Sequence, residues 1–383
     1  MMSVICELAD LRQRYHRRVP KMFQDYCESG SWKQQTLAEN SRDFQNIRFR
    51  QRVARDLEPL SLATKMVGLD AKMPLAIAPI GLLGMQHADG EIHTARAAEK
   101  FGVPFTLSTM SICSIESVAK ATQSPFWFQL YVQRDREFTK KLVERAKAVE
   151  CSALVLTLDL QMIGKRHADH RNGMTAPPRL TVPNIIDIAR RPQWALNMLR
   201  TKNREFGNIQ GAASGVDDMH DLMKWTAASF DRKLNWDDIK RFRDMWDGPL
   251  IIKGILEAND AEECVKLGAD ALVVSNHGGR QLDGARSTIS VLPEVTEKVG
   301  DDIEVWMDGG IRFGQDIIRA RGMGAKAVMV GRPAIYGLGA MGEAGVQRML
   351  EIFHEEAAHT MAFIGHREID SVCRDDLVVG SGC

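Results

Sequence analysis

The segment from Ser275 to Gly284 contains the residues whose types and spacing are best suited to chemistry. It reads Ser-Asn-His-Gly-Gly-Arg-Gln-Leu-Asp-Gly and follows an apolar run that begins at Ala271. His277 can act as a base and Arg280 can hold an anion, while the two glycines between them allow the backbone to turn sharply. A buried strand that ends in this way suits proton abstraction beside a bound anion. His-Gly-Gly alone would equally fit an ordinary glycine-rich loop.

A second group of residues is suited to phosphate. It lies where two further apolar runs end, in the sequences Asp308-Gly-Gly310-Ile-Arg312 and Gly331-Arg332. Backbone N–H groups of glycines and the forked guanidinium of arginine both bind phosphate oxygens well. Because the residues around His277 already provide a separate anion site, we favour a phosphorylated cofactor over a phosphorylated substrate.

Repeated strand–helix units are expected to position both groups. Eight apolar runs each end in polar or glycine residues, and they cover residues 74–80, 104–108, 126–132, 153–159, 249–255, 271–277, 303–311 and 327–336. Helical periodicity follows, for example over residues 135–150, 259–268, 314–324 and 342–365. Eight such units favour a closed parallel (β/α)8 TIM barrel, an α/β fold, over an open doubly wound sheet. In such barrels the catalytic residues gather where the strands end.

We expect one domain over residues 1–383, with a helical lead-in and cap over 1–73 and the barrel over 74–365. The interval 160–235 is far longer than an ordinary barrel loop. Within it, one stretch brings six bulky apolar residues and three arginines close together, and Pro192 is expected to divide this stretch into two short pieces: Ile185, Ile186, Ile188, Trp194, Leu196, Leu199, Arg190, Arg191 and Arg200. We favour a lid whose apolar side packs on the barrel. The alternative is a segment that docks on a membrane surface.

Composition excludes several classes of protein. Lysine plus arginine and aspartate plus glutamate both total 50, so the net charge is zero and nothing favours nucleic acid as a partner. The seven cysteines form no Cys-x-x-Cys pair, which fits a reducing compartment and neither a disulfide framework nor a zinc site. No signal peptide or transmembrane span is evident. A cytoplasmic protein is expected, either soluble or peripheral on the cytoplasmic face of the inner membrane.

Three other patterns are set aside. Gly322-Met-Gly324 formally matches a dinucleotide fingerprint, but it precedes an apolar run instead of following one. His167 and His170 have a spacing common on loops and no third ligand nearby, so we assign no metal. His87 and His93 flank the start of the first barrel helix, and we expect both to be exposed.

The run 273–284 as a whole resembles the signature of the FMN-dependent 2-hydroxy acid dehydrogenases and oxidases. The resemblance extends over nearly the whole chain, from Pro20 to Gly365. The stretch Pro-Ile-Gly-Leu-Leu-Gly-Met at 79–85, together with the long loop, looks most like the bacterial L-lactate dehydrogenases that deliver electrons to a quinone or a cytochrome.

The resemblance implies a TIM barrel that binds FMN, and it implies a role for each matching residue. Tyr26 and Tyr131 match tyrosines that hydrogen-bond substrate, His277 matches the catalytic base, and Asp159 matches the carboxylate that orients the base. Arg166 and Arg280 match the anchors of the substrate carboxylate. Lys253 matches the cation beside the flavin N1/O2 edge. The remaining FMN contacts are matched by Pro79, Ile80, Gly81, Ser108, Gln129, Thr157, Ser275, Asp308, Gly310, Arg312, Gly331 and Arg332.

Two departures from the family pattern affect the substrate pocket. Met110 stands where glycolate oxidases have tryptophan, and its flexible thioether leaves a roomier pocket that favours lactate or larger acids. Leu160-Gln161 stands at the entry to the long loop, where the family often has Thr-Pro after the strand-four aspartate.

The function expected is therefore FMN-dependent oxidation of an L-2-hydroxy acid, with L-lactate going to pyruvate. The alternatives within the family are an oxidase that uses oxygen and a mandelate-type dehydrogenase. Outside the family, a Schiff-base aldolase could use Lys253 as its nucleophile, and a barrel without activity could simply bind a phosphorylated ligand. The electron acceptor is expected to be a quinone, a cytochrome or oxygen, and the assembly a homotetramer. The sequence leaves open whether His277 first takes the α-proton or the hydroxyl proton.

Overall fold

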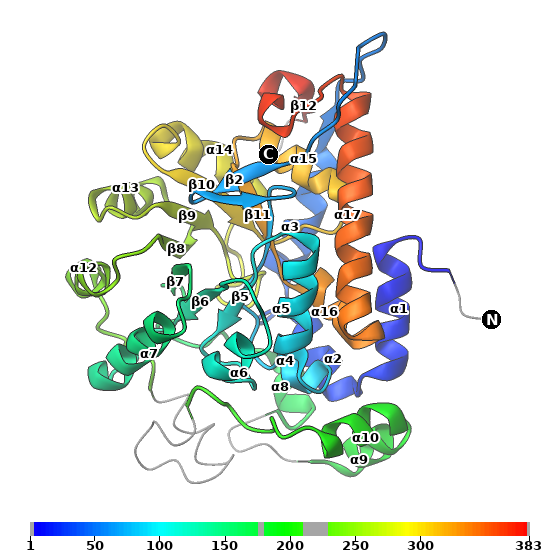
Figure 1. The fold of residues 1–383 in the computed structure, drawn as a ribbon, viewed down its shortest axis with the longest axis vertical. Coiled ribbons are helices and arrows are strands. Elements are labelled where there is room, and N and C mark those ends of the chain that lie inside the picture. Colours follow the sequence, from blue (N-terminus) through cyan, green and yellow to red (C-terminus); the bar gives the residue numbers. More distant parts are fainter. Residues whose placement is uncertain (1–3, 175–179, 210–228, 381–383) are drawn as a thin grey trace.

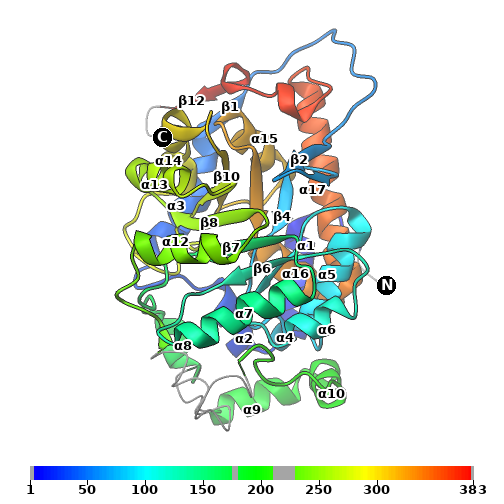
Figure 2. The same cartoon turned by 60° about the vertical axis from the view of Figure 1, so that its left-hand side comes forward.

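The computed structural model describes residues 4–174, 180–209 and 229–380. Eight parallel strands form the ring at its centre, and helices surround them (Figures 1 and 2). The strands are β4 (Leu75–Ile77), β5 (Thr106–Ser108), β6 (Trp127–Leu130), β7 (Ala153–Thr157), β8 (Leu250–Ile255), β9 (Ala271–Val274), β10 (Glu304–Asp308) and β11 (Ala327–Val330). The predicted (β/α)8 barrel is therefore confirmed.

Pairing between neighbouring strands closes the ring. Seven of the eight junctions are parallel ladders, in the order β4-β11-β10-β9-β8-β7-β6-β5. The last junction, between β4 and β5, is a single parallel bridge between Ile77 and Phe105. The register sets Thr157 opposite Lys253, and Lys253 opposite Val273. Polar side chains from β7 and β8 are thus brought to the same level of the barrel.

The interior of the barrel is packed with side chains. Trp127 and Trp306 stack inside it with ring centroids 5.4 Å apart, among small and branched residues from the other strands. Met66 and Ala71, from the hairpin of β2 (Thr64–Met66) and β3 (Leu69–Ala71), belong to the same buried cluster. A filled interior leaves the strand ends as the place for a site.

A larger apolar cluster lies between the strands and the outer helices. Those helices are α4 (Leu83–Gln86), α5 (Gly90–Phe101), α6 (Ile115–Ala119), α7 (Arg136–Ala148), α12 (Trp236–Met245), α13 (Ala258–Lys266), α14 (Thr288–Val299), α15 (Gly314–Gly322), α16 (Arg332–Met341) and α17 (Glu343–Phe363). Asp135 caps α7 through its side chain, and Asn235 caps α12.

The segment before the barrel is only partly helical. It contains α1 (Leu8–Arg18), α2 (Lys21–Glu28), α3 (Gln35–Arg42), a 3-10 turn (Asp43–Asn46) and β1 (Ile47–Phe49), as well as the β2–β3 hairpin. β1 pairs with β12 (Leu377–Val379), which follows two 3-10 turns (Ile369–Ser371 and Arg374–Asp376), so the end of the lead-in segment is joined to the C-terminal segment.

The strand ends differ from the predicted ones in a consistent direction. The run 327–336 was predicted as one strand, but β11 stops at Val330 and α16 begins at Arg332, with Pro333 in its first turn. Proline favours that position because its fixed φ suits a helix start. β10 likewise stops at Asp308, because Gly309 and Gly310 adopt positive φ. The polar residues beyond each strand therefore lie in turns that face the site.

The long interval after β7 forms α8 (His167–Arg171), α9 (Val182–Ala189) and α10 (Pro192–Arg200). Pro192 begins α10, so the predicted division into two short pieces is confirmed. Both views place α9 and α10 beyond α8 and α2, outside the ring of barrel helices (Figures 1 and 2). Within the described ranges, no helix combines the length and apolar character needed to cross a membrane.

Candidate active site

A cavity of about 230 Å³ opens at the carboxyl ends of the strands. Residues from most of the strand ends and from α2 line it, and they include most of the predicted site: Tyr26, Pro79, Ile80, Gly81, Ser108, Tyr131, Thr157, Arg166, Lys253, His277, Arg280, Asp308, Gly310, Arg312, Gly331 and Arg332. Tertiary structure thus gathers into one cavity residues that lie up to 306 positions apart in the sequence.

His277 lies between a carboxylate and a tyrosine. Its Nδ1 is 2.8 Å from Oδ1 of Asp159, and its Nε2 is 3.4 Å from the hydroxyl of Tyr131. Burial alone would raise the pKa of Asp159, but the charge of His277, their hydrogen bond and the charge of Lys253 hold that pKa below its ordinary value. The ionised carboxylate can only accept, so Nδ1 donates to it and Nε2 faces the cavity as an acceptor.

The backbone around His277 is unusual. His277, Gly278 and Gly279 all adopt positive φ, at 58°, 64° and 74°. A non-glycine residue in this region is strained, and such strain is often found at functional sites. The turn is held by the Ser275 hydroxyl, which accepts from the His277 N–H at 3.1 Å, and by Asn276, which exchanges two 2.8 Å hydrogen bonds with Asn40. The Asn40–Asn276 pair was not predicted from the sequence.

Arg280 and Arg166 both lie close to the ring of Tyr26. The Arg280 guanidinium is 4.9 Å from the centre of the Tyr26 ring and that of Arg166 is 5.8 Å away. Arg280 donates to the carbonyls of Tyr26 at 2.6 Å and Ser29 at 3.0 Å, and Arg166 donates to Asp169 at 2.6 Å. Two partly buried guanidinium groups in the same cavity as His277 have the chemistry to bind a carboxylate.

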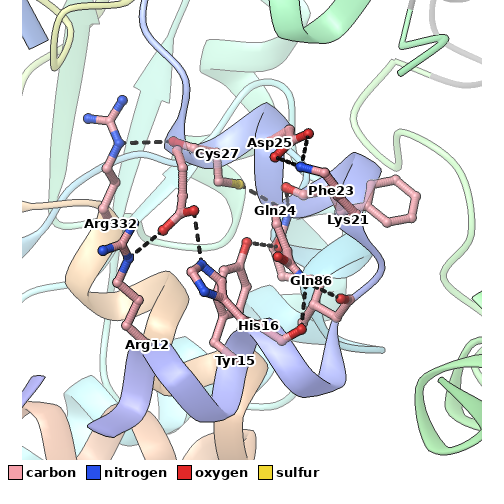
Figure 3. A network of polar contacts seen from close by, with 12 residues as sticks. Arg12, Tyr15, His16, Lys21, Phe23, Gln24, Asp25, Cys27, Gln86 and Arg332 are labelled. Carbon is pink, nitrogen blue, oxygen red and sulfur yellow. Dashed lines mark hydrogen bonds and ion pairs between the residues drawn. The ribbon is translucent and has the colours of Figure 1, made fainter. Parts of the chain in front are cut away.

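Helix α2, which contains Tyr26, is held in place by a network of polar contacts (Figure 3). Arg332 donates to the carbonyl of Cys27 at 2.9 Å. Gln86 of α4 accepts from the hydroxyl of Tyr15 at 3.0 Å and donates to the sulfur of Cys27 at 3.0 Å. The helix that places Tyr26 beside the cavity is therefore fixed from both α1 and α4.

Lys253 lines the cavity and is almost fully buried. Its Nζ lies 2.8 Å from Oδ2 of Asp308 and donates to the Ser275 hydroxyl at 2.7 Å. Burial opposes its charge, but Asp308 and Asp159 together raise the pKa of Lys253 above its ordinary value. A lysine kept protonated is a poor Schiff-base nucleophile, which argues against the aldolase alternative.

Two partly buried arginines follow β10 and β11. Arg312 and Arg332 both line the cavity together with Gly309, Gly310 and Gly331. Burial, with repulsion from Arg312 and Arg280, lowers the pKa of Arg332 to about 9. Burial also lowers the pKa of Arg312. An anionic ligand would offset the repulsion between these crowded cations, which is what a phosphate corner requires.

Unpaired buried polar atoms test whether FMN would fit. Within the described part of the chain, Thr157 Oγ1, Asp308 Oδ1 and Gln129 Nε2 are buried without a hydrogen-bond partner. Thr157 and Asp308 line the same cavity as Lys253. Such atoms are costly unless a ligand satisfies them, and the edge of a flavin ring offers both donors and acceptors. With the arginine and glycine corner for a phosphate, the residues present fit FMN.

Three residues of the predicted site do not line the cavity. Asp159 contacts it through His277, Ser275 lies behind Lys253, and Gln129 accepts a hydrogen bond from the Ser108 hydroxyl at 3.1 Å. Among lining residues without an assigned role, Phe230 packs edge-on against Tyr131 with centroids 5.5 Å apart. It lies near the end of the long interval 160–235, and no motif around it singled it out.

The histidines set aside in the sequence occupy ordinary places. His87 and His93 are half-buried and meet edge to face, with ring centroids 5.0 Å apart. The expectation that both are exposed is wrong, because Trp194 of α10 and the start of α17 come close to them. His167 and His170 lie on α8. Among the described residues, no group of histidine, cysteine and carboxylate side chains could hold a metal ion.

Helices α9 and α10 turn most of their apolar residues outward. The exposed fractions are 55% for Ile185, 48% for Ile186, 51% for Leu196 and 68% for Leu199. The favoured prediction, a lid that packs its apolar side on the barrel, is therefore wrong for most of this surface. Trp194 is the main exception, since it packs on Phe23 and donates to the carbonyl of Met85 at 3.0 Å. We call α9 and α10 together the lobe. Its exposed residues Val182, Ile185, Ile186, Leu196 and Leu199 form the apolar face of the lobe.

Comparison with known proteins agrees with this site. The family model described as FMN-dependent dehydrogenase matches residues 15–379. An L-lactate dehydrogenase of Vibrio parahaemolyticus is 42% identical over 376 residues, which cover 98% of this chain and 99% of that protein. An L-lactate dehydrogenase of Actinobacillus pleuropneumoniae is 42% identical over 379 residues, covering 98% of each chain.

Solved structures show the same fold. A crystal structure described as the monotopic membrane protein (S)-mandelate dehydrogenase is 35% identical, with a TM-score of 0.94, and the match covers 99% of this chain and 100% of that chain. A soluble mutant of the membrane-associated (S)-mandelate dehydrogenase from Pseudomonas putida is 35% identical, with a TM-score of 0.84 and coverage of 98% and 100%.

Proposed function

The chain belongs to the FMN-dependent dehydrogenase family, and we propose that it oxidises L-lactate to pyruvate with FMN as its cofactor. The observation that carries this proposal is the Asp159–His277 pair, which lies in the same cavity as Arg166 and Arg280 and next to the corner of Arg312 and Arg332. One cavity would therefore combine a base, a pair of arginines for the substrate carboxylate and a site for the phosphate of FMN.

The substrate would be held by its carboxylate. Arg166 and Arg280 offer guanidinium N–H groups in a fixed orientation, because Asp169 and the carbonyls of Tyr26 and Ser29 hold them. A doubly held carboxylate leaves the bound acid one orientation, with its hydroxyl towards His277 and the two tyrosines. Tyr26 and Tyr131 would hydrogen-bond the bound substrate.

His277 would take a proton from the substrate at Nε2. The positive charge that then develops on the ring is offset by Asp159, which stays ionised because its pKa is held low. When bound, FMN supplies the acceptor for the two electrons that leave the α-carbon. Lys253, protonated beside Asp308, would favour negative charge at the edge of the cofactor.

The remaining FMN contacts would come from the strand ends. Arg312, Arg332, Gly310 and Gly331 would hold the phosphate. Thr157, Asp308, Ser108, Gln129 and Ser275 would hold or support the polar part of the ring, with Pro79, Ile80 and Gly81 beneath it.

The test is the visible spectrum of the purified yellow protein under anaerobic conditions. Addition of L-lactate should bleach the flavin absorbance, while D-lactate should leave it unchanged. Glycolate should react more slowly, because Met110 leaves a roomy pocket. If L-lactate leaves the flavin oxidised, the proposed activity is contradicted.

A mandelate-type dehydrogenase is the second candidate. Met110, Leu160, Ile163 and Phe230 form an apolar part of the cavity wall, which an aromatic side chain could contact. Faster bleaching by L-mandelate than by L-lactate would favour this candidate.

We also propose that the apolar face of the lobe rests on a membrane and that electrons pass to a membrane quinone. The similar protein described as a monotopic membrane protein supports this docking. Arg190 and Arg200 flank the exposed apolar residues, and such a surface combines apolar burial with attraction to anionic lipid. Location on the cytoplasmic face of the inner membrane is a prediction that cell fractionation would test. Assembly into a homotetramer is a prediction that light scattering would test.

A further inference from the structure

Gln281 lies directly after Arg280, and its side chain connects two loops. It is 8% exposed. Its Oε1 accepts from the N–H of Gly164 at 3.0 Å, and its Nε2 donates to the carbonyls of Asp159 at 2.7 Å and Met162 at 2.9 Å. The amide therefore satisfies three backbone groups of the turn that follows β7.

These two loops contain four residues of the proposed active site. The β9 loop provides His277 and Arg280, and the β7 loop provides Asp159 and Arg166. The loops also touch directly at Gly164, where a Cβ would lie 2.2 Å from the carbonyl oxygen of Arg280. The amide of Gln281 and this close approach set how far apart the loops lie.

Glutamine is suited to this position by its chemistry. The amide offers one accepting oxygen and two N–H donors, which match one N–H group and two carbonyls in the turn. A carboxylate could accept from Gly164 but would repel both carbonyls, and an aliphatic side chain would leave all three groups unsatisfied.

We propose that Gln281 is a positioning residue that sets the spacing between Arg166 and Arg280 for the substrate carboxylate. This inference rests on the proposed function. Gln281 acts through the turn 159–164, and it does not line the cavity itself. Its loss should therefore weaken substrate binding more than the chemical step.

The first test is Gln281→Leu in the FMN-loaded protein, with L-lactate as substrate and pyruvate as a binding probe. KM for L-lactate and Kd for pyruvate should rise about ten- to hundredfold, the range expected when one charge-assisted contact is misplaced. The value of kcat should fall less than KM rises, and FMN should stay bound.

Asp283→Ala is the matched control. Asp283 lies on the same loop and also accepts from two backbone N–H groups, those of Lys33 at 2.9 Å and Thr36 at 3.0 Å. Its partners belong to the start of α3, so its loss should lower Tm and leave KM unchanged. If Gln281→Leu lowers Tm in the same way and leaves KM unchanged, Gln281 is only structural and the proposal is overturned.

Gln281→Glu decides the question if the leucine variant does not fold. Once protonated, the new carboxyl group could donate to one of the two carbonyls, so the KM of this variant should approach the wild-type KM as the pH falls from about 8 to about 5.5. If the ratio of the variant KM to the wild-type KM does not change with pH, the proposal is overturned. If L-lactate cannot reduce the flavin of the wild-type protein, the proposed function is contradicted. The inference about Gln281 is then tested separately, by comparing the Kd for pyruvate of Gln281→Leu with that of the wild type. If pyruvate does not bind to the wild type either, both fail.

Discussion

The cavity and the lobe of α9 and α10 differ in which kind of side chain they bury and which kind they expose. In the cavity, charged groups are buried or partly buried and held by carboxylates or backbone carbonyls, as Lys253, Arg280 and Arg332 show. On the lobe, apolar residues such as Ile185 and Leu199 are exposed. Burying charge and exposing apolar surface both cost free energy unless a partner compensates. In the proposed function, the cofactor and the substrate anion compensate the cavity, and a membrane surface compensates the lobe.

If the two regions have separate tasks, a change in one should leave the other unaffected. The largest effect is expected for His277→Gln, which removes the base and leaves the cavity polar. Flavin reduction by L-lactate, followed by stopped-flow absorbance, should slow by about a hundred- to ten-thousandfold. FMN content and vesicle binding should remain at wild-type levels. Reduction at a near wild-type rate would contradict the role given to His277.

The two anion sites within the cavity should respond differently. Arg280→Lys keeps the charge but loses the fork, so kcat/KM for L-lactate should fall about ten- to hundredfold with FMN retained. Arg332→Ala should instead weaken the retention of FMN, measured as the flavin released on dialysis. If Arg280→Lys released flavin and Arg332→Ala altered only the kinetics, the two sites would have been assigned the wrong way round.

On the lobe, Leu199→Gln should weaken binding to anionic vesicles by about tenfold, because burial of one leucine contributes on the order of 1.5 kcal/mol or more. Binding should also weaken with added salt, which screens Arg190 and Arg200. Flavin reduction by L-lactate should be unchanged. Val378→Gln, at a valine of β12 that is 44% exposed, is the control and should bind vesicles like the wild type. If wild-type protein does not sediment with anionic vesicles, the lobe has no membrane role.

The smallest effect concerns stability and pH. The pKa of Asp159 is held below its ordinary value in the folded protein, so its ionised form stabilises the fold above about pH 4. This contribution is lost as the pH falls through the lower folded pKa. Asp159→Asn should therefore have a lower Tm than the wild type near neutral pH, and the difference should shrink below about pH 4. Thermal unfolding measured across this range would show it, and a constant difference would contradict it.

The barrel and most of the cavity could be predicted because their signals are local. Each apolar run predicts a strand, and parallel strands in a barrel end on the same side, so polar residues beyond those runs must lie near one another. This was enough to bring His277, Lys253, Asp308 and Arg332 together. Two strands were predicted to extend too far, because Gly309 begins a turn and Pro333 lies in the first turn of a helix.

The sequence by itself therefore determined the fold class, the presence of a base next to an arginine, and a phosphate corner at the last two strands. Only the tertiary structure decided which groups touch. It placed Phe230 against Tyr131 and joined Gln281 to the turn at Gly164. The contact between His277 and Asp159, 118 positions apart, was implied by the family resemblance, and the structure supplied its geometry. The structure also turned the apolar face of the lobe outward, against the favoured prediction. A periodic pattern shows that a helix has an apolar side, but which surface that side meets depends on the packing of segments far apart in the chain.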